Sequence, residues 1–147
     1  MTSPSAKTGL IPIDRGDGTR VWAPSRLLYY LAGFADADGC FRWSGSTTAA
    51  SVINCYPWVL EQFRELFRGR IRARAVLSDK HKQCYEWEVT GVNARTYSRV
   101  IRPFLREKWR QADALARMME FPKGSPERDE FIRQLKVLKT YAYLRGD

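Results

Sequence analysis

The chain has 147 residues, of which 44% are hydrophobic and 13% aromatic, so it can bury the core of one domain and is not a disordered tail. Its 25 Lys and Arg against 16 Asp and Glu give a formal net charge of +9, which favours an anionic partner, either nucleic acid or an anionic membrane surface. The sequence holds no run of about 18 apolar residues and no secretory signal, so we expect no membrane span and an intracellular location, in the cytoplasm, the nucleoid or an organelle.

The first 24 residues contain three prolines and three glycines, which predicts an irregular N-terminal arm over 1–24 and a single domain over 25–147. From residue 25 onward the hydrophobic pattern alternates between periods of 3.6 and 2. It predicts a helix over 25–38, strands near 40–44 and 47–54, a helix over 56–67, strands near 70–77 and 83–91, and helices near 93–102, 105–121 and 126–144. This α+β order, αββαββα with additional C-terminal helices, predicts a four-stranded sheet covered by helices on one face.

Three cysteines, Cys40, Cys55 and Cys84, are odd in number and widely spaced, and the chain has one histidine. They form no CxxC pair, so a four-ligand zinc site is not expected. We expect reduced thiols with structural roles.

The uncovered face of the predicted sheet is unusually rich in arginine. Period-two alternation places seven polar side chains on it: Arg42, Ser44, Arg70, Arg72, Arg74, Glu86 and Glu88. Arginine can fork onto guanine in the DNA major groove, and glutamate can accept a hydrogen bond from cytosine. The face therefore favours contact with nucleic acid over an ordinary solvated surface, and its acids indicate sequence reading.

Two acids, Asp36 and Asp38, end the first helix, where the helix dipole disfavours negative charge by about 0.3–1 kcal/mol each. They either shape the turn before Gly39 or, with the free carbonyls of the last turn, form a hard oxygen site suited to Mg²⁺. The sequence offers no other catalytic set and no phosphate-binding glycine loop. Gly33 and Ala37 share one helical face, which permits either close approach of a second helix or tight packing within the domain.

The nonamer "LAGFADADG", Leu31 to Gly39, resembles the signature of the LAGLIDADG homing endonucleases and departs from it at Phe34 and Ala35. A second stretch, "RPFLREKWRQAD" from Arg102 to Asp113, is similar to the turn and helix of that family. The resemblance extends over roughly residues 25–121. It implies that the sheet is an antiparallel saddle that reads DNA.

The resemblance also implies roles for individual residues. Asp38 and the carbonyl of Ala37 would hold a divalent cation, normally Mg²⁺, with Mn²⁺ or Ca²⁺ as substitutes in binding. Asp36 would shape the turn, Lys108 would lie near the cleaved phosphate, and Asn54 would position the attacking water. The family match thus implies a metal-dependent endodeoxyribonuclease that hydrolyses phosphodiesters.

Only one copy of the nonamer occurs, which in this family implies a homodimer whose motif helices pair across a two-fold axis, with Gly33, Ala37 and Asp36 at the interface. The implied partners are double-stranded DNA and a second copy of the chain, with no membrane. The target would be long and pseudo-palindromic, cleavage would leave short 3′ overhangs, and the gene would belong to a mobile intron or intein. An RNA maturase or a non-cleaving DNA-binding protein on the same scaffold is the alternative, and a plain basic globular protein is a third reading.

Overall fold

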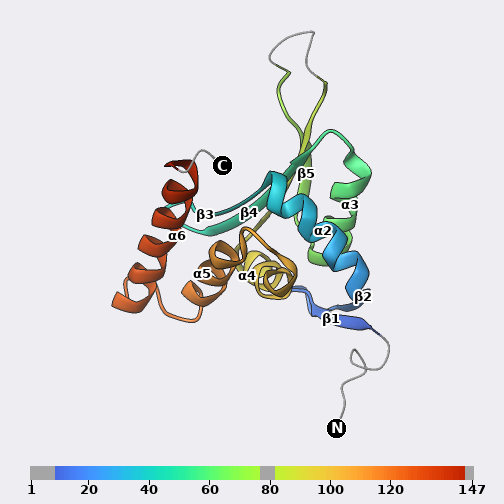
Figure 1. Ribbon diagram of the computed structural model, residues 1–147. Helices are drawn as coiled ribbons and strands as arrows, with labels where there is room; N and C mark the ends of the chain where they lie inside the picture. Colours follow the sequence, from blue (N-terminus) through green and yellow to red (C-terminus); the bar gives the residue numbers. More distant parts are fainter. Residues whose placement is uncertain (1–8, 77–81, 145–147) are drawn as a thin grey trace.

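The structure, a computed structural model, describes residues 9–76 and 82–144, except for the side chains of residues 141–144. It contains a small N-terminal hairpin, a four-stranded sheet and a set of helices (Figure 1). In chain order the elements are β1 (Leu10–Asp14), β2 (Arg20–Pro24), α2 (Ser25–Asp38), β3 (Gly39–Trp43), β4 (Thr48–Asn54), α3 (Pro57–Phe67), β5 (Arg70–Ala73), β6 (Tyr85–Thr90), α4 (Gly91–Ile101), the 3₁₀ turn η1 (Arg102–Phe104), α5 (Trp109–Met118) and α6 (Pro126–Leu144).

The main sheet has the strand order β3-β4-β6-β5, and every neighbouring pair is antiparallel. The register sets Cys40 opposite Ser51, Ser51 opposite Glu88, and Glu88 opposite Arg70, so these four residues form one row across the sheet. Because directly opposed residues point to the same face, the row confirms the phase predicted for the arginines and glutamates.

Helices α2, α3, α4 and α5 cover the other face of the sheet (Figure 1). Trp87 of β6 and Tyr97 of α4 are fully buried at the centre, where their rings meet edge to face with centroids 4.9 Å apart. Phe63 and Phe67 of α3 contact both rings. The predicted α+β architecture, with helices on one face, is therefore confirmed. Helix α6 packs beside α5 and the edge strand β3, and none of the described helices has the length and apolar character needed to cross a membrane.

The prediction of an irregular arm over residues 1–24 is wrong for its second half, because β1 and β2 pair as an antiparallel hairpin. Ile13 and Ala23 are fully buried in the main core. Pro12 is tolerated because a two-stranded ribbon has two free edges, where a strand needs no N–H donor. Gly18, with φ +88°, supplies the left-handed residue of the connecting turn. The prolines and glycines thus mark the edge and the turn of a hairpin, and residues 1–8 lie outside the described residues.

Candidate nucleic-acid interface and catalytic site

Helix α2 buries one side and leaves the other open. Leu28, Leu31, Ala32 and Ala35 face the core, whereas Gly33 and Ala37 are exposed. Apart from its chain neighbours and the backbone of α2, no heavy atom of the described residues lies within 4 Å of a Cβ placed on Gly33. Tight packing within the domain therefore does not account for Gly33, and the small-residue face is available to a second chain.

Gly39 ends the helix because the backbone turns too closely for a side chain. A Cβ at this position would lie 2.4 Å from the carbonyl oxygen of Ala35, which accepts the Gly39 N–H. The φ of Gly39 is −92°, so the requirement comes from this close approach and not from a left-handed backbone. The tight turn leads directly from Asp38 into β3.

Asp36 binds the turn at residues 106–108 to the end of α2. Its carboxylate accepts hydrogen bonds from the backbone N–H groups of Arg106 at 2.8 Å, Glu107 at 3.1 Å and Lys108 at 3.0 Å. These donors compensate a carboxylate that the helix dipole alone would disfavour. They also hold residues 106–108 outside a helix, so α5 begins at Trp109 and is shorter than the helix predicted over 105–121.

The same turn places Lys108 at the end of α2, the helix that carries the nonamer. Its Nζ donates to the carbonyl oxygen of Gly39 at 2.7 Å, directly beside Asp38 in the chain. Lys108 is half-buried, whereas Asp38 is exposed. A cation and an anion from segments 70 residues apart thus lie at the same end of α2, where the ammonium suits an anionic ligand and the carboxylate suits a metal cation.

Asn54 ends β4 and starts the turn into α3. Its side-chain oxygen accepts the N–H of Tyr56 at 2.9 Å, the usual Asx arrangement at a helix entry. The side-chain amide nitrogen is the part of Asn54 that remains suited to hydrogen bonding with water.

The open face carries two clusters, each centred on a glutamate. In the first, the Glu88 carboxylate pairs with Arg42 and, at 3.5 Å, with Arg70, while Arg42 also donates to Ser51 Oγ at 3.1 Å. The Glu88 side chain is only 11% exposed, whereas Arg70 is 71% exposed. The buried carboxylate therefore anchors guanidinium groups that reach outward.

The second cluster repeats this arrangement next to the first. Glu86 Oε1 accepts from Arg72 at 2.6 and 3.0 Å, and Oε2 accepts from Arg74 at 3.2 Å. Its side chain is 7% exposed. Because both glutamates are engaged with arginine and little exposed, direct reading of cytosine by either carboxylate would compete with its arginine partners. Ser44 lies at the margin of the face, where its Oγ donates to the Thr47 carbonyl across the β3–β4 turn.

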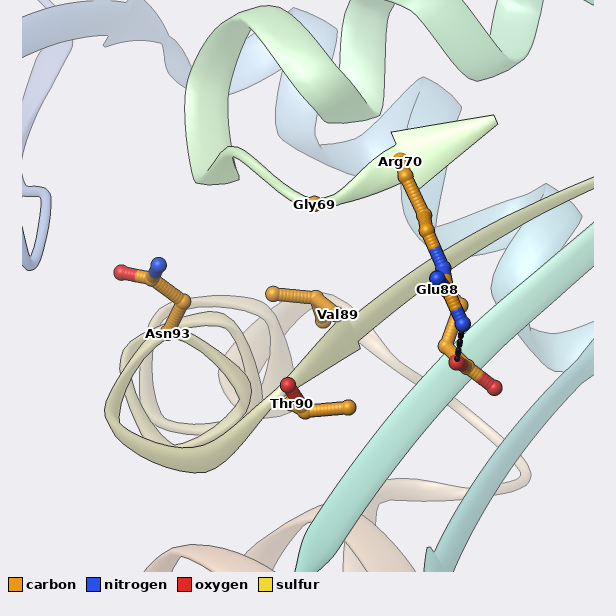
Figure 2. A pocket seen from close by; sticks show the side chains of 6 residues that line it. All are labelled: Gly69, Arg70, Glu88, Val89, Thr90 and Asn93. Atoms are coloured by element: carbon orange, nitrogen blue, oxygen red, sulfur yellow. Dashed lines mark ion pairs between the residues drawn. The ribbon is translucent and has the colours of Figure 1, made fainter. Parts of the chain in front are cut away.

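A cavity of about 340 Å³ opens beside the Glu88 cluster (Figure 2). Figure 2 shows Arg70 extending to Glu88 on one side, with Thr90 and Asn93 on the other. Asn93 Oδ1 accepts the N–H of Gly16 at 2.9 Å, so the turn of the N-terminal hairpin is fixed near this end of the face.

The carboxylate and carbonyl oxygens at the end of α2 are the type of ligand that a hard divalent cation prefers. Mg²⁺ commonly takes one or two carboxylates and completes its shell with water and substrate phosphates. Among the described residues no group of three or more His, Cys, Asp or Glu is close enough to hold a metal ion. One chain thus offers only part of a magnesium shell: the Asp38 carboxylate and adjacent carbonyls.

Comparison with protein-family models gives no match, and comparison with curated proteins gives none. Among solved structures, the homing endonuclease I-CvuI in complex with its target in the presence of Ca matches at TM-score 0.59 and 20% identity, over 76% of this chain and 80% of that one. The same endonuclease, bound to the I-CreI target with Mg, matches at 0.57 and 19%, over 82% of each chain. The archaeal intron-encoded homing endonuclease I-Vdi141I, complexed with DNA, matches at 0.59 and 17%, over 79% of this chain and 86% of that one.

The chain has the fold of these homing endonucleases. The homing-endonuclease fold confirms the architecture that the nonamer and the strand order led us to expect. Within this fold the structure brings Asp36 and Lys108 together at the end of α2, next to Asp38, and gathers the four arginines and two glutamates on one face.

Two groupings of side chains were not predicted from the sequence. Tyr30 of α2 stacks on Trp58 of α3, with ring centroids 6.5 Å apart, and both rings are about half exposed beside the small-residue face. Cys55 and Cys84 meet at the ends of β4 and β6. The pairing of those two strands was the signal that could have revealed the cysteine contact.

Proposed function

We propose that the chain is a LAGLIDADG homing endonuclease, a site-specific double-strand DNA endonuclease that acts as a homodimer. The observation that carries the proposal is the position of Lys108 Nζ at the Gly39 carbonyl, next in the chain to exposed Asp38, on a chain whose open sheet face presents paired arginines. The shared fold with DNA-bound homing endonucleases supports it.

The exposed face of α2 supports homodimer formation. Gly33 and Ala37 would lie where the two copies of α2 cross, and the small side chains allow close approach of the backbones. The exposed rings of Tyr30 and Trp58 would flank this crossing and add apolar area to it. A two-fold axis then sets two Asp38 carboxylates near each other, so that each chain serves one strand of a pseudo-palindromic site.

In the proposed catalytic site, Asp38 and the Ala37 carbonyl would hold a divalent cation, with Mg²⁺ as the natural ion and Mn²⁺ or Ca²⁺ able to bind. When bound, the cation supplies Lewis-acid chemistry to a water and to the scissile phosphate. Lys108, held at the Gly39 carbonyl, would neutralise charge on the cleaved phosphate. Asp36 keeps Lys108 in position by binding its backbone N–H, and the Asn54 amide would orient water.

On the open face, we propose that the arginines contact DNA and that the glutamates act mainly by holding them. Arg42, Arg70, Arg72 and Arg74 would contact phosphates or guanine edges. Glu86 and Glu88 are largely buried and already paired with arginine, so the more exposed guanidinium groups would meet DNA first. Holding an arginine in one rotamer lowers the entropic cost of binding and fixes which base it can reach.

Selection of cleaved sites from a random double-stranded DNA library in Mg²⁺ tests the proposal without knowledge of the target. The proposal predicts recovery of one long family of sites with two-fold symmetry, cut with short 3′ overhangs. A protein that enriches bound sequences but never cuts them would instead be a non-cleaving DNA-binding protein or a maturase. DNA binding that shows no steep dependence on salt would indicate a plain basic protein.

A further inference from the structure

Two of the three cysteines face each other across the sheet. Cys55 directly follows β4, and Cys84 directly precedes β6. The last paired residues of these antiparallel strands are Asn54 and Tyr85, so continuing the register by one residue sets Cys55 opposite Cys84. Their sulfur atoms are 2.8 Å apart, and both cysteines are free thiols in the structure.

The backbone at this point suits a covalent bridge. Opposed residues on antiparallel strands have Cα atoms about 4.5–5.5 Å apart, within the range of about 4.4–6.8 Å that disulfides span. The sulfur atoms need to approach by less than 1 Å to reach the bond length of about 2.0 Å. A bridge between Cys55 and Cys84 therefore requires little movement of either strand.

The pair is accessible to a small reagent. A hollow of about 600 Å³ is lined by both cysteines together with Ile53, Arg74 and Lys82. The two cationic side chains would attract an anionic thiol reagent such as oxidised glutathione. Both cysteines are half-buried, so their sulfur atoms are not sealed in the core.

The hollow also lies on the face that carries the arginines. Ile53 is opposite Glu86, and Arg74 pairs with Glu86 by its side chain while its backbone N–H donates to the Cys84 carbonyl at 2.9 Å. The hydrogen bond with Cys55 and partial burial raise the pKa of the Cys84 thiol, while the charge of Arg74 acts in the opposite direction. The raised pKa lowers the fraction of reactive thiolate at Cys84, so the proposal rests on the geometry of the pair.

We propose that Cys55 and Cys84 form a redox-reactive dithiol that low-molecular-weight disulfides convert to an intrachain disulfide. The thiolate of one cysteine attacks a sulfur of oxidised glutathione, forms a mixed disulfide and releases one glutathione thiolate. The thiolate of the other cysteine then attacks the protein sulfur of the mixed disulfide and releases the second glutathione. The two protons lost by the cysteines are taken up by the two departing thiolates, so one glutathione disulfide is reduced for each protein disulfide formed.

Cys40 provides an internal control. It is on the same face but in β3, where its Sγ accepts a hydrogen bond from Lys139 Nζ at 3.3 Å. With no second thiol beside it among the described residues, Cys40 can form only a mixed disulfide with glutathione. The proposal therefore predicts different products at Cys40 and at the pair.

The test is incubation of the full chain in glutathione buffers of increasing oxidised fraction, followed by alkylation and peptide mapping without reduction. We expect a peptide linked through Cys55 and Cys84, while Cys40 is alkylated or carries glutathione. Closing a loop of this length should raise the melting temperature by on the order of 10 °C, and dithiothreitol should reverse the shift. Cys55→Ser and Cys84→Ser should each lose the linked peptide and the shift, whereas Cys40→Ser should keep both.

Failure to obtain the linked peptide at a large excess of oxidised glutathione, with wild-type folding intact, would overturn the proposal. So would an oxidation-dependent shift in melting temperature that survives in Cys55→Ser and Cys84→Ser. Neither measurement requires DNA or nuclease activity. The dithiol and the proposed nuclease function can therefore fail independently.

Discussion

The two acids of the motif helix are predicted to separate cleanly in a stability measurement. Asp36 accepts three backbone hydrogen bonds, whereas Asp38, two residues later, is exposed. Loss of a capping side chain at a helix entry costs about 0.5–2 kcal/mol, and bonds to a charged acceptor are stronger than neutral ones. Because Asp36 is only half-buried, water can partly replace it, so we expect Asp36→Ala to lower the free energy of unfolding by about 2–3 kcal/mol.

Asp38→Ala is the matched control. It removes an acid from the same final turn, where the helix dipole disfavours negative charge, so the free energy of unfolding should stay unchanged or rise by ~0.3–1 kcal/mol. Asp36→Asn keeps one acceptor oxygen and should lie between wild type and Asp36→Ala. The melting temperature of Asp36→Ala should fall by about 5–10 °C.

Urea denaturation at one fixed protein concentration measures all three variants against wild type. Equal losses for Asp36→Ala and Asp38→Ala would refute the reasoning, because the two acids would then share one structural role. No loss in Asp36→Ala would also refute it, since the turn at residues 106–108 would then need no carboxylate.

Three further predictions follow from the same structure. Gly33→Leu should leave the chain folded, because a Cβ at this position meets no described atom within 4 Å apart from its chain neighbours and the backbone of α2, but should convert the proposed dimer to a monomer in light scattering, whereas Gly33→Ala should not. Glu86→Gln should broaden the set of cleaved sequences in the library selection more than it weakens binding. Arg72→Ala should weaken binding to all sequences and reduce the slope of the log binding constant against log salt concentration by about one. The reverse pattern would assign base reading to the glutamate. Hydrogen bonds from Thr19, followed by the Arg68 ion pair, lower the Asp17 pKa to about 2. Because this folded pKa is below the ordinary value, ionised Asp17 stabilises the hairpin above about pH 4, and this contribution disappears as the pH falls through 2. The difference in the free energy of unfolding between wild type and Asp17→Asn should therefore close over that range.

Much of the fold could be predicted because local pattern and tertiary structure agree. The alternation of arginine with apolar residues over 70–73, and of glutamate with Trp87 and Val89, predicted which face each side chain takes, and the pairing of β5 with β6 confirms it by setting arginine opposite glutamate and Ile71 opposite Trp87. Gly39 marked the end of the motif helix for a local reason, its close approach to the Ala35 carbonyl.

The features that could not be predicted depend on contacts between distant segments. Composition gave no indication that Asp36 binds backbone groups at residues 106–108, so the start of α5 was predicted four residues too early. The hairpin before α2 was missed because Pro12 and Gly18 look like loop residues unless the pairing of β1 with β2 is known. The contact between Cys55 and Cys84 likewise depends on the register of β4 against β6, which sequence spacing does not set.

The central claim, that each chain supplies one Asp38 to cut one strand, is tested most directly with the selected target and Asp38→Asn. We expect the Asp38→Asn variant to bind the target with wild-type affinity and to cut neither strand. We also expect mixed dimers of wild type and Asp38→Asn to nick a single strand. Double-strand cleavage by Asp38→Asn alone, or mixed dimers that still cut both strands, would contradict this claim.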